Sequence, residues 1–218
     1  MSTEFAREQM IHQQIRAWDV LAPRVLELLG QVPRELFVPR EYAGVAFADM
    51  EVPLGHGERM LAPKLVGRIL QAVEAAPGER VLEIGTGSGY LTACLATQTG
   101  TVRSLEIHAD LAARARANLE AAGIQGAEVI HADAFAPETT GGGTFDVIVL
   151  TGSLPEPDER FQRQLALGGR MFVIVGEPPV MDARLVRRVS ESEWSTESLL
   201  ETSVRPLTGA HRPESFSF

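Results

Sequence analysis

The sequence predicts an α/β protein built on a doubly wound, mostly parallel sheet, with an antiparallel pair of strands at one edge and a helical segment at the N-terminus. Two observations predict this fold. From residue 80 onward, short apolar runs alternate with stretches of helical periodicity, which is the order typical of a parallel sheet with right-handed crossovers. A glycine-rich turn follows the first apolar run, at residues 85–89, and ligands of open α/β sheets bind where the strands end.

The elements of this core follow in chain order. Strands are predicted for short apolar runs, at residues 81–84, 101–105, 127–130, 145–150 and 170–175. Helices are predicted where the spacing of apolar residues is helical, at residues 91–96, 109–121 and 156–166. Residues 184–189 and 193–204 follow without a clear helix between them, so we expect an antiparallel pair at the sheet edge. Gly141, Gly142 and Gly143 predict a flexible loop.

The first third of the chain lacks this alternation. Helices are expected at residues 4–18, 23–29 and 63–74, and prolines interrupt regular structure between the last two. Gly55-His56-Gly57 predicts a turn. We therefore expect an N-terminal helical and loop segment, residues 1–76, packed on a core of residues 77–218 to form one compact unit.

Composition limits the compartment and the partners. With 218 residues, 44% of them hydrophobic, the chain can bury a sizeable core as one domain. No apolar stretch approaches the roughly 20 residues that span a bilayer, and residues 1–8 lack the apolar centre of a signal peptide. The single Cys94 cannot form an internal disulfide. We expect a cytoplasmic protein that does not bind a membrane.

Charge and motif searches exclude several function classes. The net charge of −9 argues against a nucleic-acid partner bound through its phosphates. The five histidines show no spacing typical of a metal site, so none is expected. Neither the nucleophile elbow G-x-S-x-G nor the phosphate-binding G-x-x-x-x-G-K-[ST] is present. The sequence leaves the oligomeric state open.

The glycine turn carries the strongest functional signal. Its pattern is Glu83-x-Gly85-x-Gly87-x-Gly89, whereas a dinucleotide site needs G-x-G-x-x-G, and position 90 is Tyr. The carboxylate of Glu83 would repel a pyrophosphate but suits the amine of an amino-acid-bearing ligand. Glu106 ends the next apolar stretch, where a doubly wound fold places the acid that binds a ribose diol.

Together these features resemble the cofactor site of class I S-adenosylmethionine methyltransferases, which have a Rossmann-like fold. The resemblance implies S-adenosylmethionine as cofactor and S-adenosylhomocysteine as product. In it, Glu106 would bind the ribose hydroxyls, and Glu83 would either lie near the methionine amine or order the loop. Asp133 would contact the adenine amine, or would simply cap a helix. The implied site consists of Glu83, Gly85, Thr86, Gly87, Ser88, Gly89, Tyr90, Glu106, Ile107, Asp133, Ala134 and Thr151.

Several further blocks, in register along the chain, resemble protein-L-isoaspartate O-methyltransferases. They are Gln14-Ile15-Arg16, residues 32–39 (VPRELFVP), Phe47-Ala48-Asp49, residues 53–57 (PLGHG), residues 80–90 (RVLEIGTGSGY) and residues 204–209 (VRPLTG). The resemblance implies methyl esterification of L-isoaspartyl residues in damaged proteins, which lets them return to aspartyl through a cyclic imide. The implied partner is a protein or peptide that contains isoaspartyl residues.

One block departs from the pattern of that family. A Q-T-I-S-Q-P-like loop is typical, but residues 58–63 read Glu-Arg-Met-Leu-Ala-Pro, which puts Arg59 at the threonine position and Leu61 at the serine position. Leucine cannot donate a hydrogen bond, whereas Arg59 could bind a carboxylate with two parallel bonds. For an acceptor that needs a base, His56 is a candidate, with a turn-stabilising role as its alternative. Three hypotheses stay open: isoaspartyl methylation, methylation of another acceptor, and a catalytically silent S-adenosylmethionine-binding interaction module.

Overall fold

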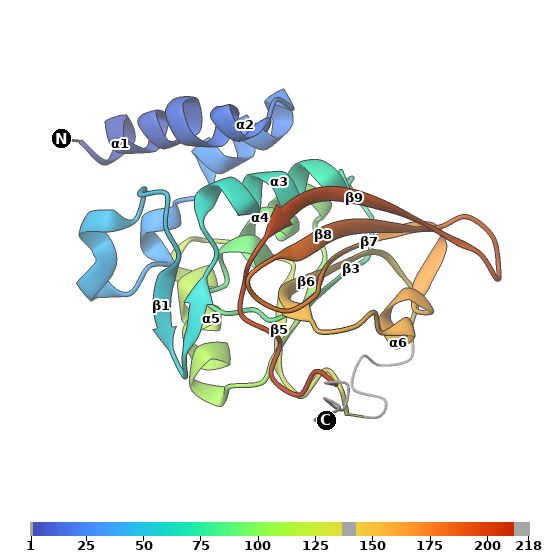
Figure 1. Ribbon diagram of the computed structural model, residues 1–218. Coiled ribbons are helices and arrows are strands. Elements are labelled where there is room, and N and C mark those ends of the chain that lie inside the picture. Colours follow the sequence, from blue (N-terminus) through green and yellow to red (C-terminus); the bar gives the residue numbers. More distant parts are fainter. Residues whose placement is uncertain (1, 137–142, 212–218) are drawn as a thin grey trace.

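The computed structural model describes residues 2–136 and 143–211 (Figure 1). Its centre is a seven-stranded sheet with the order β5-β4-β3-β6-β7-β8-β9. The strands are β3 (Val81–Ile84), β4 (Val102–Glu106), β5 (Ala127–His131), β6 (Phe145–Leu154), β7 (Leu165–Val175), β8 (Met181–Arg188) and β9 (Trp194–Thr202). The first five run parallel, and β8 and β9 pair antiparallel at the edge. The predicted mostly parallel sheet with its antiparallel edge pair is therefore confirmed.

The order of the strands reverses beside β3. The chain runs from β3 outward to β4 and β5, then returns to place β6 on the other side of β3. Such a reversal opens a crevice at the carboxyl ends of the strands, where open α/β sheets bind their ligands. The glycine turn follows β3 directly, so it lies at this crevice.

Two apolar clusters cover the two faces of the sheet. On one face, the buried side chains of β3, β4 and β6 pack with helices α3 (Pro63–Val73), α4 (Tyr90–Thr99) and α5 (Ala109–Ala121). The other face packs against α6 (Glu159–Gln162) and side chains such as Leu207. Neighbouring residues of β3 alternate between the clusters, Val81 in the first and Leu82 in the second, as the two-residue period of a strand requires.

The helix predicted over residues 156–166 was wrong in extent, because α6 covers Glu159–Gln162. Prolines 155 and 157 precede the helix, and Asp158 caps it by accepting a hydrogen bond from the Arg160 amide. Leu165 already pairs with Phe145 as part of β7. Of the predicted glycine loop, Gly141 and Gly142 lie outside the described residues.

The N-terminal segment forms an outer layer over α3 and α4 (Figure 1). Residues predicted as one helix form α1 (Thr3–Gln9), a π-helical turn, η1 (Met10–Ile15), and a 3-10 turn, η2 (Arg16–Trp18). Helix α2 (Pro23–Gln31) follows, then the 3-10 turns η3 (Arg34–Leu36) and η4 (Arg40–Val45). Buried side chains of this segment belong to the same cluster as those of α3 and α4.

A short hairpin leads from the N-terminal segment to α3. Its strands are β1 (Val52–Gly55) and β2 (Glu58–Met60). The predicted turn is confirmed, and all three of its residues, Gly55, His56 and Gly57, have positive φ angles (108°, 54° and 76°). Within residues 2–136 and 143–211, no helix combines the length and the apolar character needed to cross a membrane.

Candidate active site

The carboxyl ends of β3, β4 and β6 meet at a cavity of about 950 Å³ that opens to solvent. Its walls include the glycine turn with the loop after β4, the hairpin strand β2, the segment at residues 204–208, and residues that follow β5 or belong to β6, such as Ala134 and Thr151. The crevice predicted by the strand order is therefore a real hollow in the structure.

The glycine turn is locked to β6 through Thr151. The Thr151 hydroxyl donates to the carbonyl oxygens of Ile84 (3.0 Å) and Gly85 (2.7 Å). Gly85 has a φ of 92°, and a Cβ atom there would lie 2.3 Å from Thr151 Oγ1. Position 85 therefore requires glycine both for its backbone angle and for its contact.

Glu106 ties the loop after β4 to the same turn. Its Oε2 accepts a hydrogen bond from the Gly87 amide at 2.8 Å, and its Oε1 accepts one from the His108 amide at 3.0 Å. The side chain is 4% exposed and lines the cavity. The carboxylate is therefore oriented by two backbone amides, and each oxygen keeps further acceptor capacity.

Glu83 is fully buried beneath the turn. Its Oε2 accepts hydrogen bonds from Thr92 (2.5 Å) and Ser104 (2.6 Å), and Ser104 is in turn hydrogen-bonded to Thr86 (2.6 Å). Among the described residues, no donor lies within hydrogen-bond distance of Oε1. Burial raises the pKa of Glu83 to about 7; the bonds from Ser104 and Thr92 counteract this, and the charge of Glu106 adds to it. A buried acid with one free oxygen favours a cationic group beside it.

The remaining cofactor candidates divide between the cavity wall and its surroundings. Residues that line the cavity are Gly85, Thr86, Gly87, Ser88, Tyr90, Ile107, Ala134 and Thr151. Gly89 lies outside the lining and precedes α4 with a φ of 86°. Asp133 is exposed and outside the lining as well, and its Oδ1 accepts a bond from the Phe135 amide (2.8 Å). That bond closes a turn rather than capping a helix.

On the opposite wall the structure brings Arg59 and Leu61 to the cavity, but not His56. Leu61 is partly buried, and Arg59 is exposed. Burial raises the pKa of Glu51, another lining residue, and the nearby charge of Arg59 counteracts that rise. His56 is exposed on the hairpin turn, where Nε2 is hydrogen-bonded to Asp110 (2.8 Å) and the ring stacks on that of His108 (4.2 Å).

Arg34 supports this wall from below and was missed as a site residue. It is fully buried, and it donates from Nε to the Ala46 carbonyl and from Nη2 to the Leu61 carbonyl, both at 2.9 Å. Burial is the main cause that lowers the pKa of Arg34. The sequence signal for this role is a basic residue within a mostly apolar stretch that contains Leu29, Val32 and Phe37.

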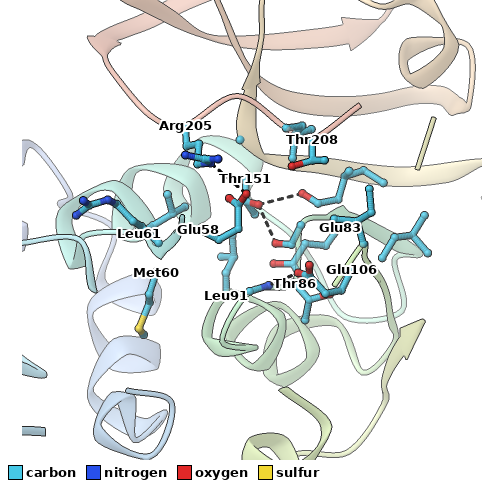
Figure 2. A pocket seen from close by; sticks show the side chains of 18 of the residues that line it. Glu58, Met60, Leu61, Glu83, Thr86, Leu91, Glu106, Thr151, Arg205 and Thr208 are labelled. Carbon is cyan, nitrogen blue, oxygen red and sulfur yellow. Dashed lines mark hydrogen bonds and ion pairs between the residues drawn. The ribbon is translucent and has the colours of Figure 1, made fainter. Parts of the chain in front are cut away.

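The segment at residues 204–208 closes a further side and was also missed. It is held to β6 by two backbone hydrogen bonds. The Ser153 amide donates to the Arg205 carbonyl oxygen (3.0 Å), and the Leu207 amide donates to the Ser153 carbonyl oxygen (2.9 Å). Arg205 Nε donates to Glu58 Oε1 at 3.1 Å. Figure 2 shows this pair beside Leu61, with Glu83 and Glu106 toward the glycine turn. The segment therefore brings a cation to the cavity that cofactor motifs do not reveal.

The charges of the wall indicate what the cavity can hold. Four carboxylates, Glu51, Glu58, Glu83 and Glu106, and two guanidinium groups, Arg59 and Arg205, line it. A ligand with cationic groups suits the acidic side, and an anionic group can bind to the arginines. Among the described residues, no group of three or more His, Cys, Asp or Glu side chains is arranged to hold a metal ion.

Relatives and solved structures share this architecture. A protein-L-isoaspartate O-methyltransferase of Aeropyrum pernix is 38% identical over 210 residues, covering 94% of this chain and 80% of the relative. A protein-L-isoaspartate O-methyltransferase 1 of Rhodopseudomonas palustris is 39% identical over 212 residues, covering 95% and 86%. A Plasmodium falciparum structure described as a protein-L-isoaspartate O-methyltransferase superposes with a TM-score of 0.80 at 21% identity, covering 95% of this chain and 99% of that one.

The family assignment follows from the extent of these matches. The family model described as protein-L-isoaspartate(D-aspartate) O-methyltransferase matches residues 5–212. That range includes the N-terminal helices, the hairpin, the glycine turn and the segment that closes the cavity. The chain belongs to the protein-L-isoaspartate(D-aspartate) O-methyltransferase family.

Proposed function

We propose that this chain transfers the methyl group of S-adenosylmethionine to the free carboxylate of L-isoaspartyl residues in damaged proteins. The observation that carries the proposal is the hydrogen bond between the glycine turn and Glu106, which together form one wall of the cavity in a member of this family. The arginines on the opposite side of the cavity suit an acidic acceptor. The enzyme is an S-adenosylmethionine-dependent O-methyltransferase.

S-adenosylmethionine is the cofactor, and the Plasmodium falciparum structure is a complex with S-adenosyl-L-homocysteine. The residues of this chain fit that molecule. The unpartnered Oε1 of Glu83 suits the methionine ammonium group, and the oriented carboxylate of Glu106 suits the ribose hydroxyls. We place the adenine beside Ala134, with Asp133 as the contact for its amine, although this needs the exposed Asp133 side chain to turn toward the cavity.

The chemistry explains why no catalytic base is needed. A carboxylate oxygen forms a bond to the methyl carbon while the sulfonium leaves as a thioether, so no proton moves. An ordinary carboxyl group, with a pKa of about 4, is already ionised at neutral pH. The residues of the cavity then act by holding the two reactants in line, an effect that can supply roughly 7–11 kcal/mol. The position of His56 outside the cavity lining agrees with such a mechanism.

The test is transfer of labelled methyl to a peptide with one isoaspartyl residue, beside the same peptide with ordinary aspartate. We expect label on the isoaspartyl peptide alone, as a base-labile ester. Cofactor binding without transfer to either peptide would contradict the proposal and favour a silent binding module. Transfer to another acceptor, abolished by Glu106→Ala, would instead show a methyltransferase with a different substrate.

We further infer a cytoplasmic location and no nucleic-acid or membrane partner. The net charge of −9 opposes binding to phosphate backbones and to anionic lipids. Cys94 is buried, and burial raises the pKa of its thiol, so it behaves as a core residue. Localisation of a tagged chain by cell fractionation tests this inference; recovery with membranes would overturn it.

A further inference from the structure

The wall around Leu61 sets a problem for binding an anionic acceptor. The Leu61 side chain has no hydrogen-bond donor, and the lining also contains two acids of the same part of the chain, Glu51 and Glu58. A buried carboxylate without a donor or a cation is costly. The acceptor carboxylate therefore needs a donor or a cation from this wall, and the cations that the lining offers are Arg59 and Arg205.

The guanidinium of Arg205 is held from two sides. Its Nε donates to Glu58 Oε1 at 3.1 Å. On the other side it packs on the bare backbone of the hairpin turn, because a Cβ atom at Gly57 would lie 2.9–3.1 Å from its Nη1, Cζ and Nη2 atoms. The Arg205 backbone is fixed as well, because its carbonyl oxygen accepts a hydrogen bond from the Ser153 backbone amide (3.0 Å). The side chain is thus oriented although it is 52% exposed.

This arrangement leaves the bidentate edge of the guanidinium available. The group carries five N–H donors in a rigid fork. Among the described residues, the one hydrogen bond that it makes comes from Nε. The Nη1–Nη2 edge can therefore bind both oxygens of a second carboxylate while Glu58 stays bound at Nε.

Arg59 is placed less well for this role. It lies between Glu58 and Met60 on β2, so its side chain leaves the strand on the opposite face from theirs. Met60 is buried in the core, whereas Arg59 is exposed. The charge of Arg59 acts on Glu51, whose pKa it lowers against the effect of burial. The charge of Arg59 thus already stabilises the ionised carboxylate of Glu51.

We propose that Arg205 binds the isoaspartyl carboxylate of the substrate through its Nη1–Nη2 edge, and that it thereby replaces the hydroxyl donors absent around Leu61. Glu58 and Gly57 hold the guanidinium in the orientation that this contact needs. The inference rests on the proposed isoaspartyl activity. It assigns substrate specificity to a residue of the segment at 204–208, outside the hairpin loop.

The test compares Arg205→Met, Arg205→Lys and Arg59→Met with the unchanged chain, with isoaspartyl peptide as the varied substrate. Arg205→Met keeps the apolar stem of the side chain and removes the fork. A charge-assisted hydrogen bond contributes about 1.5–3 kcal/mol, so we expect the KM for the peptide to rise about 10- to 100-fold. Arg205→Lys keeps the charge, so its KM for the peptide should rise less than that of Arg205→Met. We expect the Kd for S-adenosylhomocysteine to change less than about threefold, because the cofactor side is untouched, and kcat to fall as well, because Arg205 would hold the reacting carboxylate in line.

Arg80→Met is the matched control. Arg80 is 55% exposed and its Nε lies 3.5 Å from Asp146 Oδ2, at the amino end of β3 and outside the cavity lining. We expect no change in the KM for the peptide. Thermal unfolding of each variant separates a binding defect from a folding defect.

Three results would overturn the inference. An unchanged KM in Arg205→Met, with the unchanged chain active, would refute it while the proposed function stands. A rise in the KM for the peptide in Arg59→Met but not in Arg205→Met would show that the hairpin binds the carboxylate. If the unchanged chain transfers no methyl to isoaspartyl peptide, the proposed function fails, and this inference fails with it.

Discussion

The guanidinium carbon of Arg34 lies 4.9 Å from the centre of the Tyr90 ring, with both side chains buried. Tyr90 begins α4, directly after the glycine turn, and Arg34 belongs to η3 in the N-terminal segment. Because Arg34 also donates to the Leu61 carbonyl, one buried cation joins the cavity wall around Leu61 to the helix that follows the glycine turn. The N-terminal segment therefore supports the site as well as covering the core.

Replacing Arg34 with Met should destabilise the protein. The substitution leaves the carbonyl oxygens of Ala46 and Leu61 without their donor and removes the cation from the Tyr90 ring. A buried polar group that loses its partner costs on the order of 1–3 kcal/mol. The loss of these partners outweighs the relief of removing a desolvated charge, so we expect the free energy of unfolding to fall by about 2–4 kcal/mol in urea titrations.

Arg68→Met provides the comparison for this loss. Arg68 also donates to two carbonyl oxygens, those of Trp18 and Leu199, but at 3.3 Å each and from a partly exposed position. Its replacement should cost less than about 1 kcal/mol. Equal losses in the two variants would show that burial and the contact with Tyr90 contribute nothing.

Gly85→Ala should damage both the fold and cofactor binding. The new Cβ atom would lie 2.3 Å from Thr151 Oγ1, and the φ of 92° is unfavourable for alanine. Backbone strain and overpacking each cost about 1–3 kcal/mol. We expect a loss of roughly 2–5 kcal/mol in stability and at least about tenfold weaker binding of S-adenosylhomocysteine by calorimetry.

Gly100→Ala separates the two causes. Gly100 ends α4 with a similar φ of 83°, but a Cβ atom there would meet nothing within 4 Å. This variant should show the strain alone, about 1–2 kcal/mol, with cofactor affinity unchanged. If Gly85→Ala lost no more stability than Gly100→Ala, the locking of the turn by Thr151 would be refuted.

Much of the fold could be predicted because its signals are local. The apolar runs of β3 and β6 and the glycines between β3 and α4 are read from neighbouring residues alone. The helix predicted over residues 156–166 was too long, because prolines and the cap at Asp158 shorten it and because Leu165 pairs with Phe145 across the sheet. Pairing between distant strands overrides local helical spacing.

The cavity wall at the strand ends could be predicted from the sequence, and the other walls less completely. Glu83, Gly85 and Glu106 belong to strand ends whose position follows from the topology. Arg34 and Arg205 reach the cavity through contacts across 27 and 147 residues of sequence, with Leu61 and Glu58 respectively. No periodicity or spacing encodes such contacts, although both arginines belong to blocks that resemble the family, residues 32–39 and 204–209.

Glu106→Gln should weaken binding of S-adenosylhomocysteine. The carboxylate accepts from the amides of Gly87 and His108, and an amide side chain would present an NH₂ group to one of them. Loss of one charged acceptor costs about 1–3 kcal/mol, which corresponds to roughly 10- to 100-fold in Kd. Glu128→Gln is the control, because Glu128 is 60% exposed and pairs with Arg103 on the sheet surface. An equal effect of both changes on Kd would disprove a specific role for Glu106.

Glu83→Gln should change how stability depends on pH. In the folded chain burial raises the pKa of Glu83 to about 7, from an ordinary value of 4.5. Between these values the unfolded chain loses its proton first, so the free energy of unfolding falls as pH rises and levels off above about pH 7. From pH 5 to pH 8 the unchanged chain should lose up to about 3 kcal/mol relative to the variant, measured by urea unfolding at both pH values. Saturating S-adenosylhomocysteine should reduce this difference, because its ammonium group would stabilise the ionised carboxylate. A difference between the two proteins that does not vary with pH would mean that Glu83 titrates normally in its buried position.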